Sequence, residues 1–278
     1  MTVETHVDRA RDRVAAERDA TADERRAYER FRSALASIPT ASAPTGAGGG
    51  GAGFGNGTGG GPGPSAGGVR AIAGATNAAS TDGCRRVREA FAETMRPHSV
   101  PDGSDGEPLL ATVREELGDA VAVALSPKTD HDFTRPVASA IASAVDDRLA
   151  ELAVFDRTLE REAASLRSAG ETVRETTDWL STADETPLSA LGFDALRRRH
   201  EALGERIEAC EALLAERQAD LDRTASRGAA VGVRQRSTVA YLYDDFTVSY
   251  PVLSTVARLV ETLRECRRAV RDHLVRRA

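Results

Sequence analysis

The residues of this sequence that could carry chemistry fall into a few short groups. In one of them, Thr129-Asp130-His131-Asp132, two carboxylates flank a histidine. Such side chains bind zinc or hard cations, but adjacent residues cannot all face one ion without ligands from another segment. A polar loop that caps a helix beginning at Thr134 explains them equally well. We therefore predict neither a metal site nor a cofactor.

His200 occupies a core-facing position in an amphipathic helix predicted from about residue 189 to residue 226. It could titrate near neutral pH, but we favour a structural histidine at the core edge that bonds a carbonyl or a carboxylate. Cys84, Cys210 and Cys266 are isolated, which is typical of a reducing compartment. No nucleophile–base arrangement or acid–base carboxylate pair follows from the spacing, so we predict that the protein is not an enzyme.

A cluster of aromatic residues stands out, because aromatics make up only 4% of the chain, yet three of its four tyrosines fall between residues 241 and 250. Clustered aromatics can form a hot spot for a partner. They can also close the end of a helical bundle, which we favour, although any functional surface is expected here. The candidate interaction patch consists of Arg234, Arg236, Tyr241, Tyr243, Phe246 and Tyr250.

Arginines recur at helical spacing along the last predicted helix, which begins near Pro251. A face of this kind can contact phosphates, with binding that weakens steeply as salt rises. Arginines that alternate with acidic residues are more often solvated and paired within the chain. The candidate basic face consists of Arg264, Arg267, Arg268 and Arg271.

Charge is unevenly distributed along the chain. The net charge is −6, yet residues 227–278 contain ten arginines and only five carboxylates. Lys128 is the sole lysine among 37 basic residues, which suggests a GC-rich genome and is compatible with a high-salt cytoplasm. The basic tail is expected to meet either the acidic middle of the same chain or an acidic partner.

These groups must be positioned by helices, because apolar residues recur in steps of three and four along most of the chain. The fold class is therefore predicted as all-α, with a long antiparallel helical hairpin of coiled-coil type and additional packed helices. Four segments are expected: an amphipathic helix over 1–38, a Gly-rich disordered linker over 39–80, a pair of short helices over 81–126, and the hairpin with C-terminal helices over 134–278.

Two features support this division. Fourteen of the 23 residues from Gly46 to Gly68 are glycine, which favours a flexible tether. The segment lacks the Lys and the flanking strand of a phosphate-binding loop. The apolar seam of the returning hairpin helix, which follows a turn at Pro187, reads Phe193, Leu196, His200, Leu203, Ile207, Cys210, Leu214, Arg217 and Leu221.

Three stretches resemble an uncharacterised family of haloarchaeal proteins, known as a domain of unknown function. They are Glu185-Thr-Pro-Leu-Ser-Ala-Leu-Gly-Phe193, Arg227-Gly-Ala-Ala-Val-Gly-Val-Arg-Gln-Arg236, and Val239-Ala-Tyr-Leu-Tyr-Asp-Asp-Phe246 with Tyr250-Pro-Val-Leu. The resemblance covers the first helix and most of 83–278. It implies a haloarchaeal source, but it implies no activity and no functional residues.

The functional hypothesis is a non-enzymatic helical interaction, scaffold or regulatory module. The first helix has a seam that must be buried on the body of the protein or on another copy, so the expected partner is an unknown protein or the chain itself. The alternative is a nucleic-acid-associated regulator that uses the Arg-rich final helix. The amino terminus has no apolar signal core and no run of about 20 apolar residues follows, so we expect a cytoplasmic protein without a membrane partner.

Overall fold

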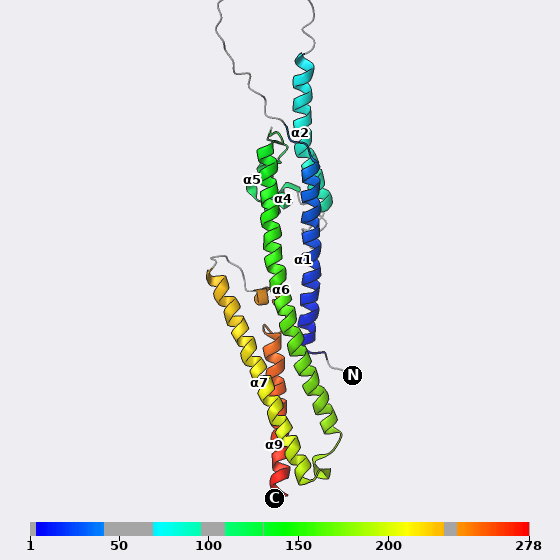
Figure 1. Ribbon diagram of the computed structural model, residues 1–278, viewed down its shortest axis with the longest axis vertical. Coiled ribbons are helices and arrows are strands. Elements are labelled where there is room, and N and C mark those ends of the chain that lie inside the picture. The colour runs from blue at the N-terminus through cyan, green and yellow to red at the C-terminus, as the bar shows by residue number, and fades with distance from the viewer. Residues whose placement is uncertain (1–3, 42–68, 96–108, 130, 231–237, 278) are drawn as a thin grey trace, which may run out of the picture. The chain divides into compact units, whose positions relative to one another are not determined.

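The computed structural model of the chain describes residues 4–41, 69–95, 109–129, 131–230 and 238–277, with only the backbone described for 69–81 and 223–230. Within these ranges the chain is helical apart from turns and one isolated bridge between Ala41 and Thr134, which confirms the all-α prediction (Figure 1). Residues 42–68, at the centre of the predicted linker, lie outside the description. The elements are α1 (His6–Ser37), α2 (Val69–Thr94), α4 (Leu109–Leu117), α5 (Asp119–Ala124), α6 (Arg135–Asp184), the 3-10 helix η1 (Leu188–Ala190), α7 (Phe193–Ala230), α8 (Thr238–Leu242) and α9 (Pro251–Val275).

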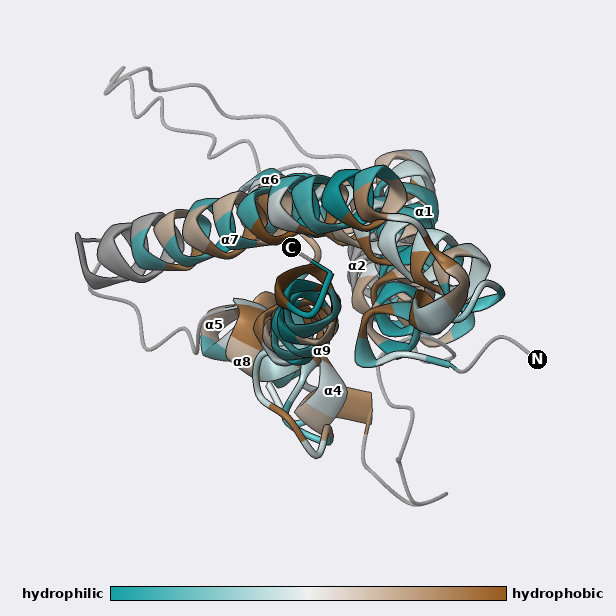
Figure 2. Cartoon of the chain, turned by 90° about the horizontal axis from the view of Figure 1, so that it is seen from below, coloured by the Kyte–Doolittle hydropathy of each residue, from teal (hydrophilic) through white to brown (hydrophobic). Residues whose placement is uncertain are grey.

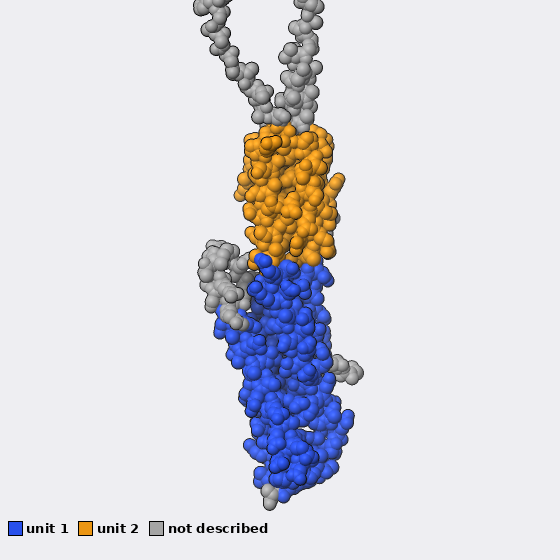
Figure 3. Space-filling model, viewed as in Figure 1, with its two compact units in different colours: residues 1–20, 155–278 blue, residues 21–154 orange. Residues whose placement is uncertain are grey.

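The chain forms two compact units, shown in different colours in Figure 3. Unit 1 contains residues 1–20 and 155–278, and unit 2 contains residues 21–154. Helices α1 and α6 each contribute residues to both units. The division into four segments made from the sequence stays a prediction.

Unit 1 is built on a helical hairpin in which the chain turns between Asp184 and Phe193. Close to the turn, the guanidinium carbon of Arg206 lies 4.0 Å from the ring centroid of Trp179. Farther from the turn, Arg217 of α7 is bonded to Glu162 of α6. The second contact is farther from the turn than the first on both helices. Helices α6 and α7 therefore run antiparallel, as the sequence predicted.

Helix α9 packs along α7. At the turn, the Arg277 guanidinium donates hydrogen bonds to the carbonyl oxygens of Ser189 and Leu191. Further along, Arg264 of α9 pairs with Glu211 of α7. Hydrophilic and hydrophobic residues alternate along α7 in Figure 2, as expected for an amphipathic helix.

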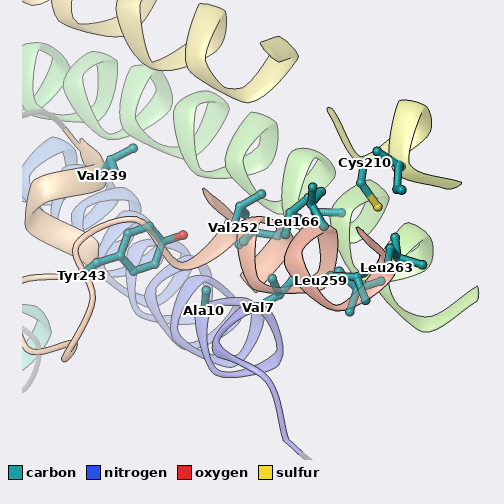
Figure 4. Close-up of a cluster of buried hydrophobic side chains, with 14 of the residues drawn as sticks. Val7, Ala10, Leu166, Cys210, Val239, Tyr243, Val252, Leu259 and Leu263 are labelled. Carbon is teal, nitrogen blue, oxygen red and sulfur yellow. The ribbon is translucent and has the colours of Figure 1, made fainter. Parts of the chain in front are cut away.

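The first turns of α1 belong to the core of unit 1. Thr5 and Asp8 cap the helix reciprocally, because the Asp8 amide donates to the Thr5 hydroxyl oxygen and the Thr5 amide donates to the Asp8 carboxylate. Val7, Ala10 and Val14 are then buried with residues of α6, α7, α8 and α9 (Figure 4). The seam at the start of α1 is therefore buried on the chain's own body.

Unit 2 has an aromatic core of its own. Phe31 of α1 and Phe91 of α2 are fully buried, with ring centroids 5.4 Å apart in an edge-to-face arrangement. Phe133 is buried with them, and its carbonyl oxygen accepts a hydrogen bond from the Ala41 amide. Large fully buried aromatics stabilise a core whose surrounding helices are rich in alanine.

Two element boundaries of unit 2 differ from the sequence prediction. The helix expected to begin near residue 81 begins at Val69, inside the predicted linker segment. Residues 69–80 contain five alanines, and alanine has the highest helix propensity. The second helix of the pair expected over 81–126 is broken into α4 and α5 at Gly118, whose φ of 90° lies in the left-handed region that glycine adopts without strain.

Two helical glycines give opposite predictions for alanine substitution. A Cβ at Gly83 would lie 2.7 Å from the Cβ of Phe133, whereas a Cβ at Gly170 would meet nothing closer than 3.7 Å. We expect Gly83→Ala to lower the free energy of unfolding by about 1–3 kcal/mol through overpacking. Gly170→Ala is the matched control and should raise it by roughly 0.5–1 kcal/mol through helix propensity.

Chemical denaturation of the full-length protein, followed by circular dichroism, measures both changes. A Gly83→Ala variant as stable as the wild type would contradict the packing of α2 against Phe133.

Candidate functional site

A buried polar network in unit 1 joins α6, α7 and the segment that follows α8. Glu162 of α6, Arg217 of α7 and Tyr243, which follows α8, have only 7%, 5% and 2% of their surface exposed. Arg217 donates two hydrogen bonds to the Glu162 carboxylate, at 2.8 and 2.6 Å, and a third to the Ser165 hydroxyl at 3.1 Å. The Tyr243 hydroxyl donates to the same carboxylate at 2.6 Å. One carboxylate thereby connects α6, α7 and the segment after α8.

The electrostatics of this network follow from its burial. Burial by itself would lower the pKa of Arg217, but the hydrogen bonds and charge of Glu162 outweigh it and raise that pKa. Burial and the Glu162 charge raise the pKa of Tyr243 far above its usual value. The tyrosine therefore keeps its proton and remains a hydrogen-bond donor to Glu162. The network therefore links α6, α7 and the segment after α8 through one ion pair and the hydrogen bonds to Glu162.

The aromatic segment extends from this network to the surface. The Phe246 ring packs on the Tyr243 ring, with centroids 5.2 Å apart. The guanidinium carbon of Arg9 lies over the Phe246 ring, 5.4 Å from its centroid. Tyr241 and Tyr250 are 45% and 52% exposed. The Tyr241 hydroxyl donates to Glu17 at 2.9 Å, and its ring contacts Phe155 edge-to-face.

The predicted interaction patch is thus divided between the interior and the surface. Tyr243 lies in the core and Phe246 is partly buried, so these two rings pack inside unit 1. Figure 4 shows Tyr243 among the buried side chains of unit 1. Tyr241 and Tyr250 remain exposed, as a binding surface requires. Arg234 and Arg236 lie outside the described residues.

The predicted basic face of α9 is largely occupied by contacts within the chain. Arg264 is paired with Glu211 at 2.6 Å, and Arg268 lies 3.8 Å from Glu265. Arg267 is half-buried, and its guanidinium lies against α7 at Gly204. Arg271 is exposed on the next turn of α9. The four arginines therefore do not present a uniform row of unpaired positive charges.

The remaining sequence candidates lie apart from this network. His200 is half-buried, and burial together with Arg267 and Arg271 lowers its pKa. In the Thr129–Asp132 loop, Asp130 lies outside the described residues, and the His131 carbonyl oxygen accepts a hydrogen bond from the Cys84 thiol. In the part of the chain that the structure describes, no group of three or more His, Cys, Asp or Glu side chains could hold a metal ion.

Unit 2 contains a second network of the same composition. The Tyr28 hydroxyl donates to the Glu116 carboxylate, and Arg148 lies 3.9 Å from that carboxylate and 3.1 Å from Glu24. Burial and the hydrogen bond to Glu116 raise the pKa of Tyr28. Each unit therefore contains a carboxylate that accepts a tyrosine hydroxyl and pairs with an arginine.

Sequence reasoning did not identify the pair of Glu162 and Arg217 as a site. The signal was present in part, since Arg217 falls on the apolar seam of its helix, where a charge requires a buried partner. Glu162 directly precedes Ala163, a small residue packed against the core, and gives no comparable signal.

Comparison with known proteins bears on the family alone. No curated protein and no solved structure matches the chain significantly. Among the described residues, no helix combines the length and apolar character needed to cross a membrane. The model of one family, described as a domain of unknown function (DUF7260), matches residues 5–267. This match spans nearly the whole chain, including both networks, and the protein therefore belongs to the DUF7260 family of domains of unknown function.

Proposed function

We propose that the protein is a non-enzymatic helical interaction module that binds a protein partner through the exposed Tyr241 and Tyr250. One observation carries this proposal. The segment 238–250 is anchored from inside by Tyr243, whose hydroxyl is bonded to the buried pair of Glu162 and Arg217. The same segment exposes about half of the surface of its two other tyrosines.

An anchored segment with exposed aromatic rings suits protein recognition. Tyrosine supplies a large apolar ring and a polar hydroxyl at low conformational cost, and it is enriched at interface hot spots. The Tyr241 ring is already oriented by its contact with Phe155 and by its hydrogen bond to Glu17. Preorganised side chains lose less entropy on binding, so more of the contact energy contributes to affinity.

Self-association through the seam of α1 has less support than a separate partner. Val7, Ala10 and Val14 are buried in the core of unit 1, while Phe31 and Leu35 are buried in the core of unit 2. A second copy that used this seam would have to displace these intramolecular contacts. The nucleic-acid alternative is likewise weakened by the pairing of Arg264 with Glu211, and it is kept as an outcome of the test.

The proposed setting is the cytoplasm of a haloarchaeon, with α6 and α7 pairing as a coiled coil. The single lysine among 37 basic residues and the scattered, free cysteines support this setting. The steps of three and four on the seam of α7 support the coiled coil.

The test is affinity purification of the tagged full-length protein from a haloarchaeal lysate, with and without nuclease. We expect one defined protein to be recovered in both samples by the wild type. Tyr250→Ala and Tyr241→Ala should each reduce its recovery about tenfold or more, as expected for hot-spot residues.

Phe193→Ala is the matched control, because Phe193 is a similarly exposed aromatic elsewhere in unit 1, at 48% exposure. It should leave recovery unchanged. Equal losses in all three variants would overturn the assignment of the surface. Recovery that disappears with nuclease would favour the nucleic-acid alternative instead.

A further inference from the structure

Two arginines of α9 and one histidine of α7 come together where these helices pack, because Arg267 lies against α7 and both Arg267 and Arg271 act on His200. On α9, Arg267 and Arg271 are one helical turn apart, and on α7, His200 and Gly204 are one turn apart. The Arg267 guanidinium lies against Gly204, where a Cβ would approach one of its nitrogens to 3.1 Å. Because glycine leaves this space open, the guanidinium lies close to the α7 backbone beside His200.

In the described part of the chain, neither of these two arginines forms an ion pair with a carboxylate. Among the described residues, ion pairs join Arg264 to Glu211 and Arg268 to Glu265, but none involves Arg267 or Arg271. The buried Nε of Arg267 has no hydrogen-bond partner in the described part of the chain. Glu201, the acidic residue that acts on His200, lies 3.9 Å from Arg197.

We propose that His200, Arg267 and Arg271 form a binding site for a small phosphate-bearing anion between α7 and α9. Guanidinium groups donate paired hydrogen bonds that match phosphate oxygens, and a protonated imidazole adds a third charged donor. The neighbouring Arg264 and Arg268 are engaged by carboxylates, so the available positive charge is compact. A compact charge suits one phosphate group better than a nucleic-acid backbone, which needs successive contacts along its length.

The site also predicts a linkage between the anion and the His200 proton. The groups that act on His200 are Arg267 and Arg271 of α9 and Glu201 of α7. In the free protein, burial and the two arginines lower the pKa of His200. A bound dianion offsets the arginine charges, so it should raise this pKa, and by linkage the anion should bind more tightly as the pH falls.

The experiment uses the full-length protein and NMR of the His200 ring. Inorganic phosphate is titrated at fixed pH to obtain the affinity, and the pH titration is repeated with and without sulfate, whose charge is constant over this range. We expect saturable binding of phosphate and a raised His200 pKa in sulfate. Arg271→Gln should weaken phosphate binding by about threefold to fivefold and should raise the His200 pKa in the absence of any anion.

Arg268→Gln is the matched control, because it removes the same charge from an exposed position on α9 without touching the site. It should leave both the affinity and the His200 pKa unchanged. Equal weakening by the two variants, or no saturation with phosphate, would overturn the proposal. A short single-stranded oligonucleotide forms the second arm. Tighter oligonucleotide binding that Arg264→Gln and Arg268→Gln also weaken would assign the surface to nucleic acid and overturn the small-anion site.

Discussion

Replacing Glu162 with leucine is expected to lower the free energy of unfolding by about 3–5 kcal/mol. The substitution leaves Arg217, of which only 5% is exposed, as an uncompensated buried charge. It also removes the acceptor of the Tyr243 hydroxyl. Urea denaturation of the full-length protein, monitored by circular dichroism, measures the loss.

Two further variants isolate the interaction. Glu160→Leu removes an exposed carboxylate from the same helix and should change stability by less than about 0.5 kcal/mol. The double variant Glu162→Leu with Arg217→Met should recover most of the loss, because a buried ion pair and an apolar pair of similar volume are often nearly equivalent in stability. Losses that simply add in the double variant would contradict the paired geometry.

Placing a carboxylate at Leu203 should cause the other large loss. Leu203 is 1% exposed on the face of α7 that forms the core of unit 1. Leu203→Asp removes a buried side chain and replaces it with a charge that has no partner, so we expect the free energy of unfolding to fall by at least about 4 kcal/mol.

The matched control is Ala209→Asp, which introduces the same carboxylate at an exposed position on α7. It should remain within about 0.5 kcal/mol of the wild type. If Leu203→Asp retained the stability of this control, the assignment of the α7 seam to the core would be wrong.

The long helices could be predicted because their amphipathic pattern is local. The seam positions Leu196, Leu203, Ile207 and Cys210 are all buried in unit 1, and Pro187 lies in the turn between α6 and α7 as expected. Because the apolar pattern repeats over many turns, it predicts a long helix even where single residues, such as His200 and Arg217, depart from it.

The helix boundaries in unit 2 were harder to predict from the sequence, because they depend on single residues. The break between α4 and α5 depends on the positive φ of Gly118, and an isolated glycine inside a helical pattern is often tolerated. The early start of α2 depends on alanine propensity in a segment that follows a glycine-rich run. Apolar periodicity does not detect either feature.

The candidate site was predicted only in part. The aromatic cluster could be recognised because aromatic residues are rare elsewhere in the chain. Which of its rings face the core depends on tertiary packing. Tyr243 is buried because Glu162 and Arg217, 81 and 26 positions earlier in the chain, provide a hydroxyl acceptor and its counter-charge. Such a long-range pairing leaves little trace in one sequence apart from an arginine on an apolar seam.

Binding of a protein partner by the exposed Tyr241 and Tyr250 can be measured directly by site-specific photo-crosslinking in cells. A photo-reactive phenylalanine analogue replaces Tyr250 in one sample and Phe193 in the other. We expect a discrete protein adduct from position 250 and none of the same mass from position 193. No adduct at position 250, or the same adduct from both positions, would contradict this expectation.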